Sequence, residues 1–258
     1  KQKTAYEIHE RLVGSEMCIR DRLLPTAKTV EQTLIEAERQ VSGKDSELSG
    51  RVKLSLPAVP VTHISESVAE FAQNYPRIEL DISVSDEPVD LARREADIAV
   101  RGLPKDKRPP KDIVGIKIGR ISLGYYVHKE LLSEAARGQR QLTCIRASHT
   151  VLNLGDLPAP ETLGLESRHL IDCLTPRMVA VTHKLGVAAL PCFLARQHPD
   201  LILLPGVPSA HWGHTWLLHH KDLRQSARIR ALFKHLAELG EKWPSVWDTS
   251  VEEQIKAA

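Results

Sequence analysis

The sequence has few cysteines and no long apolar segment. Its four cysteines, Cys18, Cys144, Cys173 and Cys192, include no C-x-x-C pair. Disulfide frameworks and structural zinc sites need closely spaced thiols, so we expect four free thiols, buried and reduced in a cytoplasmic protein. No apolar run approaches the roughly 20 residues that cross a bilayer. The sequence therefore predicts no membrane-spanning helix and no membrane partner.

An excess of charge of one sign is also missing. The 258 residues carry 35 Lys+Arg against 33 Asp+Glu, a formal net charge of +2. DNA-binding domains usually concentrate basic charge, so this balance argues against direct binding of nucleic acid. The apolar fraction of 42% is enough for a sizeable core. At about 150 residues per domain, the length predicts one large domain or two small ones.

Motifs for catalysis and cofactor binding are absent as well. The sequence contains no G-x-S-x-G nucleophile elbow, no P-loop and no G-x-G-x-x-G dinucleotide motif. Twelve histidines raise the question of a metal, and His211 and His214 lie three residues apart. No third ligand accompanies them at a spacing such as H-E-x-x-H. We therefore expect no catalytic residue, no cofactor and no metal site.

The first 22 residues lack a clear hydrophobic period and the features of a signal peptide. The run VGSEMCIRDR, from Val13 to Arg22, resembles a translated sequencing-adapter artefact. We expect residues 1–22 to form a disordered leader without a function of its own.

Residues 23–49 are expected to form one helix with a narrow apolar seam. The seam consists of Ala27, Val30, Leu34, Ala37, Val41 and Leu48. Steps of three, four and seven residues are typical of a coiled-coil heptad. Pairing with a second chain and packing against the same domain both explain this pattern.

From Gly50 onward, strand and helix patterns alternate. The first unit is expected to contain strand 52–56, helix 61–75, strand 78–84, helix 87–95 and strand 97–100. This alternation predicts parallel strands with helical crossovers. The rest is expected to contain strands 113–118 and 122–128, helix 129–136, strands 142–145 and 168–171, helix 175–185, strand 187–190, helix 192–197, strands 201–204 and 214–219, and a C-terminal helix through Ile229 and Leu239. Residues 243–258 are expected to be a loose tail.

The order of the residues resembles the effector-binding domain of LysR-type transcriptional regulators over about residues 26–240. The landmarks are Gly50 with Val52, Leu54 and Leu56; Phe71 with Tyr75-Pro76; Ile78-Glu79-Leu80; Asp90-Leu91; and Asp97 to Gly102. Later landmarks are Lys184 to Pro191, His220 to Leu223 and Arg228 to Leu232.

This resemblance implies an α/β fold of two Rossmann-like lobes of the type II periplasmic-binding-protein kind, preceded by a linker helix. The effector-binding domain would span 50–242, with crossings near Ser122 and Trp216. Lobe 1 would then be about 51–121 plus 217–242, and lobe 2 about 122–216. The linker helix would join two chains in a homodimer or homotetramer. The dimerisation residues would be Val30, Leu34, Ala37 and Val41.

The family's winged helix-turn-helix is not recognisable before the linker. A domain that contacts the major groove needs a recognition helix with basic and amide side chains, which residues 1–22 do not supply. DNA is therefore expected as a partner only through the missing helix-turn-helix.

In the implied fold, a small-molecule effector lies in the cleft where strand ends meet helix N-termini. The candidate effector-binding residues are Val59, Thr62, His63, Arg101, Gly102, Arg146 and Thr175. Arginine side chains and helix N-termini suit a carboxylate.

Simpler roles are open for several candidates. Thr62 and Thr175 would each serve as a helix cap, His63 would be solvated, and Arg101 would pair on the surface with Asp97 or Glu95.

The sequence thus predicts the effector-sensing domain of a bacterial transcriptional regulator that binds a small, carboxylate-bearing metabolite in the inter-lobe cleft. The alternative is a solute-binding protein of a transporter, which has the same fold. That protein would carry an export signal and would lack the apolar seam at 27–48. A small α/β hydrolase is disfavoured by the missing nucleophile motif.

Overall fold

The computed structural model describes residues 30, 33–34, 47–58, 62–85, 89–148 and 154–242. The predicted leader, the predicted tail and most of the linker helix lie outside these residues, as do Ala37 and Val41. Val30 and Leu34 have helical backbone and are exposed. Within the described residues, no helix is long and apolar enough to cross a membrane.

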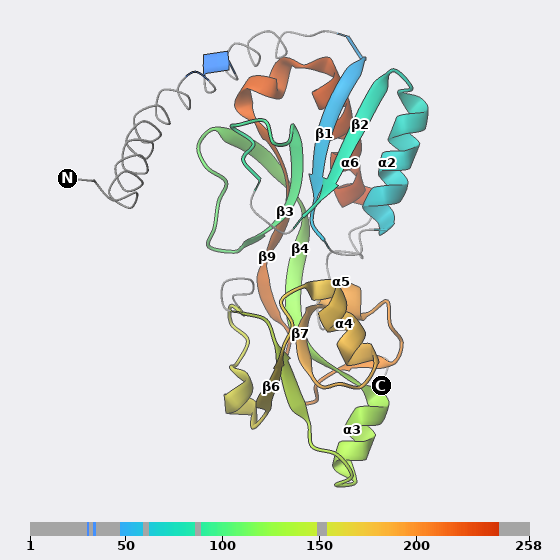
Figure 1. Ribbon diagram of the computed structural model, residues 1–258, viewed down its shortest axis with the longest axis vertical. Coiled ribbons are helices and arrows are strands. Elements are labelled where there is room, and N and C mark those ends of the chain that lie inside the picture. The colour runs from blue at the N-terminus through green and yellow to red at the C-terminus, as the bar shows by residue number, and fades with distance from the viewer. Residues whose placement is uncertain are drawn as a thin grey trace, which may run out of the picture.

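The described chain forms two lobes joined by two long strands (Figure 1). In chain order the elements are β1 (Gly50–Leu56), α2 (Thr62–Asn74), β2 (Ile78–Val84), β3 (Ile98–Pro104), β4 (Ile113–His128), α3 (Lys129–Ala136), β5 (Thr143–Arg146), η1 (Pro160–Leu163), β6 (Glu166–Leu170), α4 (Leu174–Thr182), β7 (Ala188–Pro191), α5 (Cys192–Ala195), β8 (Leu201–Leu203), β9 (Ala210–His220), η2 (Lys221–Gln225) and α6 (Ala227–Lys242). The main sheet has the order β2-β1-β3-β9-β4-β7, with β8 paired to β4, and β5 pairs with β6 in a second sheet.

The first lobe contains the parallel unit that the sequence predicts. β1 pairs in parallel with β2 and with β3, in a register that sets Leu54 opposite both Ile82 and Ile98. Alternate residues Val52 and Leu54 of β1 are fully buried. They pack against the apolar face of α2, which includes Phe71, and against α6.

Two local predictions are wrong. No helix forms over the described residues 89–95, which make turns instead. The Oδ1 atom of Asp90 accepts hydrogen bonds from the backbone N–H groups of Ala92 and Arg93. Such a side-chain bond favours a turn over a helix. Arg94 then takes a positive φ of 58°.

The second wrong prediction concerns the strands 113–118 and 122–128. They form one strand, β4, which pairs with β9 from Ile113 to Leu123 and with β7 and β8 at its end. Register shifts between Lys117 and Gly119 and between Ile121 and Ser122 bend this pair without ending it. A bulge of this kind changes the direction of a strand and increases its twist.

The two lobes have separate hydrophobic cores, and β9 contributes to both. Leu217 of β9 packs into the core of the first lobe, whereas Trp212 of the same strand packs against a core of the second lobe. Ser122 of β4 lies opposite His211, and Lys117 lies opposite Trp216. We propose that the second crossing lies near His211, opposite Ser122, and that the expected crossing at Trp216 belongs to the first lobe.

The thiols differ in burial. Cys144 and Cys192 are buried, as predicted, but Cys173 is exposed because it lies at the N-cap position before α4. Cys18 lies outside the described residues.

Gly213 of β9 lies between β3 and β4, opposite Pro104 on one side and Ile121 on the other. A Cβ atom at this position would lie 1.9 Å from the carbonyl oxygen of Leu103 and 2.8 Å from Cα of Pro104. Both obstacles are backbone atoms of β3, so no side-chain rotation relieves them. A glycine is therefore required for β3 and β9 to pair at this point.

We expect Gly213→Ala to lower the free energy of unfolding by about 3 kcal/mol or more, because the added methyl group forces the strands apart. Gly102→Ala is the matched control on β3, because its Cβ would meet only side-chain atoms, at 3.1 Å and beyond. That control should change the free energy of unfolding by about 1 kcal/mol or less. Urea denaturation measures both, and equal losses would contradict the proposed backbone clash.

Candidate functional site

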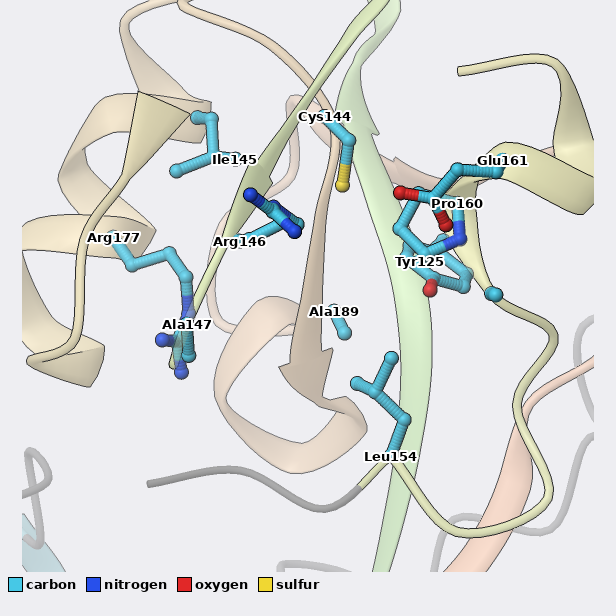
Figure 2. Close-up of a pocket in the computed structure, with 11 residues that line it drawn as sticks. Tyr125, Cys144, Ile145, Arg146, Ala147, Leu154, Pro160, Glu161, Arg177 and Ala189 are labelled. Atoms are coloured by element: carbon cyan, nitrogen blue, oxygen red, sulfur yellow. The ribbon is translucent and has the colours of Figure 1, made fainter. Parts of the chain in front are cut away.

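A cavity of about 100 Å³ lies within the second lobe. Its walls come from β4, β5, β7, α4 and the segment that leads into η1 (Figure 2). The inner wall contains Tyr125, Cys144 and Ala189. Each of these residues is at most 5% exposed. The Tyr125 hydroxyl donates a hydrogen bond of 2.8 Å to the carbonyl oxygen of Pro158. This bond ties the loop before η1 to the sheet and so fixes one wall of the cavity.

Three charged side chains line this cavity. Arg146 at the end of β5 and Glu161 in η1 are exposed, whereas Arg177 in α4 is only 2% exposed. In Figure 2 the ends of Arg146 and Glu161 point into the cavity from opposite walls. The site thus has two cationic groups, one anionic group and an apolar inner wall.

Arg177 lies where a cation is least expected on electrostatic grounds. It belongs to the first turn and a half of α4, close to the positive end of the helix dipole. Its Nη1 atom donates to the carbonyl oxygens of Ile171, at 2.8 Å, and of Asp172, at 3.3 Å. These bonds hold a buried guanidinium beside the cavity and compensate part of its desolvation.

The thiol of Cys144 lies among the same charges. Burial, with a smaller contribution from the charge of Glu161, raises its pKa to about 11, although Arg146 and Arg177 act in the opposite direction. At neutral pH this cysteine is therefore a neutral, apolar part of the wall. A nucleophilic cysteine would need the thiolate form, which burial disfavours at this position.

Of the predicted site residues whose side chains the structure describes, only Arg146 lines this cavity. Val59 lies outside the described residues, and Thr62 and His63 are placed only as the first residues of α2. Gly102 lies in β3, where a Cβ atom would come within 3.2 Å of the Trp212 ring.

Arg101 is oriented toward β1. Its Nη2 atom donates to Oγ of Ser55 at 2.7 Å, and Nη1 donates to the carbonyl oxygens of Ser55 and Val100. The two suggested acidic partners contact other groups. Asp97 accepts from the backbone N–H of Lys53, and Glu95 accepts from that of Asp90.

Thr175 is not the N-cap of its helix, so that alternative is wrong. The N-cap is Cys173, and α4 begins at Leu174. The Thr175 hydroxyl instead donates a hydrogen bond of 3.1 Å to the carbonyl oxygen of Ala58, which lies 117 residues away in the loop after β1. This bond connects the second lobe to the first. A second connection is the ion pair between Lys105, just after β3, and Asp156.

Sequence reasoning missed Glu161 and Arg177. A cation in the first turns of a helix opposes the helix dipole, and this unfavourable placement was the available signal for Arg177. Glu161 carries no such signal, because an acidic residue after proline is ordinary at the start of a helical turn.

The strand pair between the lobes carries a second polar cluster. Nε of Arg120 donates to Nδ1 of His211 at 3.2 Å, and the rings of His211 and His214 meet edge to face at 4.9 Å. Burial lowers the pKa of both histidines, and the charges of Arg120 and Lys117 lower it further. Across the described ranges, no group of three or more His, Cys, Asp or Glu residues is arranged to hold a metal ion.

Comparison with known proteins gives consistent matches. The model of the LysR substrate binding domain family matches residues 45–241. A probable HTH-type transcriptional regulator, LtrA of Klebsiella pneumoniae, is 25% identical over 260 residues, which cover 89% of this chain and 82% of that protein.

Solved structures show the same fold. Full-length AphB, a virulence activator of Vibrio cholerae and a member of the LTTR protein family, has a TM-score of 0.58 at 16% identity, covering 90% of this chain and 79% of that one. The AmpR effector binding domain of Citrobacter freundii has a TM-score of 0.57 at 15% identity, covering 75% of this chain and 100% of that one. The predicted α/β fold of the periplasmic-binding-protein kind is confirmed.

We expect Thr175→Val to weaken the contact between the lobes, because valine has the same shape but no hydrogen to donate to Ala58. The free energy of unfolding should fall by about 1 kcal/mol, and the radius of gyration in small-angle X-ray scattering should increase. Thr182→Val is the matched control, since its hydroxyl donates within α4 to Val179. An increase in the radius of gyration of both variants would refute a specific role for Thr175.

We also expect acid to destabilise the protein through His211 and His214. Their pKa is lower in the folded chain than the value near 6.5 of an unfolded chain, so the unfolded chain binds more protons. The contribution of the two histidines to the free energy of unfolding is fully present above about pH 6.5. It is lost as the pH falls toward their pKa in the folded chain. The double substitution His211→Gln and His214→Gln should reduce this slope in urea unfolding between pH 7.5 and 5. An identical slope in the unmodified and the doubly substituted protein would contradict the prediction.

Proposed function

The chain belongs to the LysR substrate-binding-domain family, and we propose that its second-lobe cavity binds a small carboxylate-bearing effector. The chain is the effector-binding domain of a LysR-type regulator. The family consists of transcriptional regulators that bind small-molecule effectors and DNA and that oligomerise. This membership favours the regulator over the transport protein on the same fold.

The observation that carries the proposal is the pair of arginines at the cavity. Arg146 is exposed at its edge, and buried Arg177 lines the same space. A guanidinium forms paired hydrogen bonds with a carboxylate, and these charge-assisted bonds are stronger than neutral ones. Arg146 contacts the ligand in this proposal, and Arg177 adds positive potential from the interior.

The size of the cavity limits the ligand. An engineered apolar cavity of about 150 Å³ accommodates benzene, whereas this one measures about 100 Å³. The space suits a carboxylic acid of a few non-hydrogen atoms. The apolar inner wall formed by Tyr125, Cys144 and Ala189 would contact its hydrocarbon part.

The position of α4 suggests how binding would reach the rest of the domain. Arg177 lies beside the cavity, and Thr175, two residues earlier in the same helix, contacts Ala58 of the first lobe. A ligand shifts a conformational equilibrium only by its difference in affinity for the two states. A carboxylate that draws Arg146 and α4 together would favour one arrangement of the lobes.

Several finer features belong to the same proposal. The predicted cleft residues Val59, Thr62, His63, Arg101 and Gly102 would form the first-lobe side of a larger site. The linker helix would join chains through Val30, Leu34, Ala37 and Val41, with transcription as the output. The domain would act in the cytoplasm and without catalysis.

We expect propionate to raise the melting temperature and to bind measurably in isothermal titration calorimetry. Propionamide, which has the same shape without the charge, should not bind. Arg146→Gln should weaken propionate binding by roughly ten- to a hundredfold, as expected for a lost hydrogen bond to a charged group.

Arg168→Gln is the matched control, because Arg168 is an exposed arginine of β6 that does not line the cavity. This variant should bind propionate as the unmodified chain does. Two results would overturn the proposal: unchanged binding by Arg146→Gln, or a loss that follows Arg101→Gln alone.

A further inference from the structure

Glu161 gives the cavity a second chemical requirement besides a carboxylate. It is the one acidic side chain among the residues that the structure places around the cavity. Figure 2 shows its carboxylate directed inward, on the wall opposite Arg146. A site for a simple carboxylate gains nothing from this residue, because two negative charges repel each other.

The local structure holds Glu161 in this position. Pro160 is buried at the start of η1, and Gly164 ends the turn in the left-handed conformation with a φ of 69°. The backbone N–H of Gly164 donates to the carbonyl oxygen of Glu161 at 3.1 Å, and that of Leu165 donates to Pro160 at 3.0 Å. The backbone that carries Glu161 is therefore fixed against the buried wall of the lobe.

The side chain is held as well. The Ser167 hydroxyl of β6 donates to Oε1 of Glu161 at 3.2 Å. An ionised carboxylate accepts several hydrogen bonds through its two oxygen atoms, so this contact leaves acceptor capacity. The bond orients the side chain, and a carboxylate can accept from a ligand in addition to its contacts within the protein.

The charges around the cavity are thus separated by sign. The guanidinium groups of Arg146 and Arg177 lie on one side, and the carboxylate of Glu161 lies on the other (Figure 2). Between them are the buried, apolar surfaces of Cys144 and Tyr125. A short molecule with a negative group at one end and a positive group at the other would complement this arrangement.

We propose that the cavity selects a small zwitterion, an amino carboxylic acid of a few non-hydrogen atoms, whose ammonium group donates to Glu161 while its carboxylate binds Arg146. This inference rests on the proposed function and narrows its class of ligand. The ammonium group supplies three donors, and its positive charge offsets the repulsion between Glu161 and the ligand's carboxylate. A carboxylate without an ammonium group leaves that repulsion in place.

The test compares β-alanine with propionate, which has the same carbon chain and lacks the amino group. In isothermal titration calorimetry with the full chain near pH 7, β-alanine should bind at least about tenfold more tightly than propionate, as expected for one added charge-assisted hydrogen bond. Arg146→Gln should weaken the binding of both compounds.

Glu161→Gln should remove the preference. β-Alanine should then bind no more tightly than propionate, while propionate should bind equally well or better because the repulsion is gone. Glu166→Gln is the matched control, since Glu166 is an exposed acid of β6 outside the cavity. It should keep the full preference. Equal melting temperatures of the two glutamine variants would exclude a folding defect as the cause.

The outcomes separate this inference from the proposed function. If propionate binds through Arg146 as tightly as β-alanine does, the inference is overturned and the carboxylate site stands. If Glu161→Gln keeps the preference for β-alanine, the role of Glu161 is overturned. If neither compound binds the unmodified chain, the proposed function and this inference both fail.

Discussion

The antiparallel pairing of β4 with β9 is the interaction on which the rest of the structure depends. These two strands run through both lobes, and their hydrogen bonds continue from Ile113 opposite His220 to Leu123 opposite Ala210. Because the pairing is continuous, each lobe is built on one end of the same ribbon. The bulges near Gly119 and Ser122 bend this ribbon between the lobes. The position of one lobe relative to the other therefore follows from the course of a single strand pair.

The candidate site lies in the second lobe, which contains the C-terminal part of β4. Tyr125 of β4 forms part of the cavity wall and holds the loop before η1 through Pro158. Charged groups then surround an apolar interior, where water screens them less than at the surface. Arg177 remains buried because the carbonyl groups of Ile171 and Asp172 accept its hydrogen bonds. A buried cation in the first turns of a helix opposes the dipole, and these two carbonyl acceptors offset part of that cost.

Sequence patterns predicted the elements of the fold far better than they predicted the site. The alternation of Val52, Leu54 and Leu56 was enough to predict β1, because burial on one face imposes a period of two. The turn at Asp90 was missed, since a side-chain bond to Ala92 and Arg93 overrides helix propensity there. Among the described candidate residues, Arg146, which follows the predicted strand 142–145, is the one that lines the cavity. For Thr175, a candidate effector-binding residue with a cap as the alternative, the contact with Ala58 was not foreseen, because the two residues lie 117 positions apart.

The sequence by itself determined the family, the α/β class and most of the strands and helices, because each of these depends on residues close together along the chain. Hydrophobic period, turn residues and the order of landmarks from Gly50 to Pro191 all have this local character. Only the tertiary structure decided which side chains meet. Arg146, Glu161 and Arg177 come from a strand, a 3-10 turn and a helix. β5 pairs with β6, η1 contacts β6, and α4 contacts β4 and β7, and this packing brings the three side chains to one cavity. Contacts of this range depend on how elements that are far apart in the sequence pack together, which no short stretch of sequence encodes.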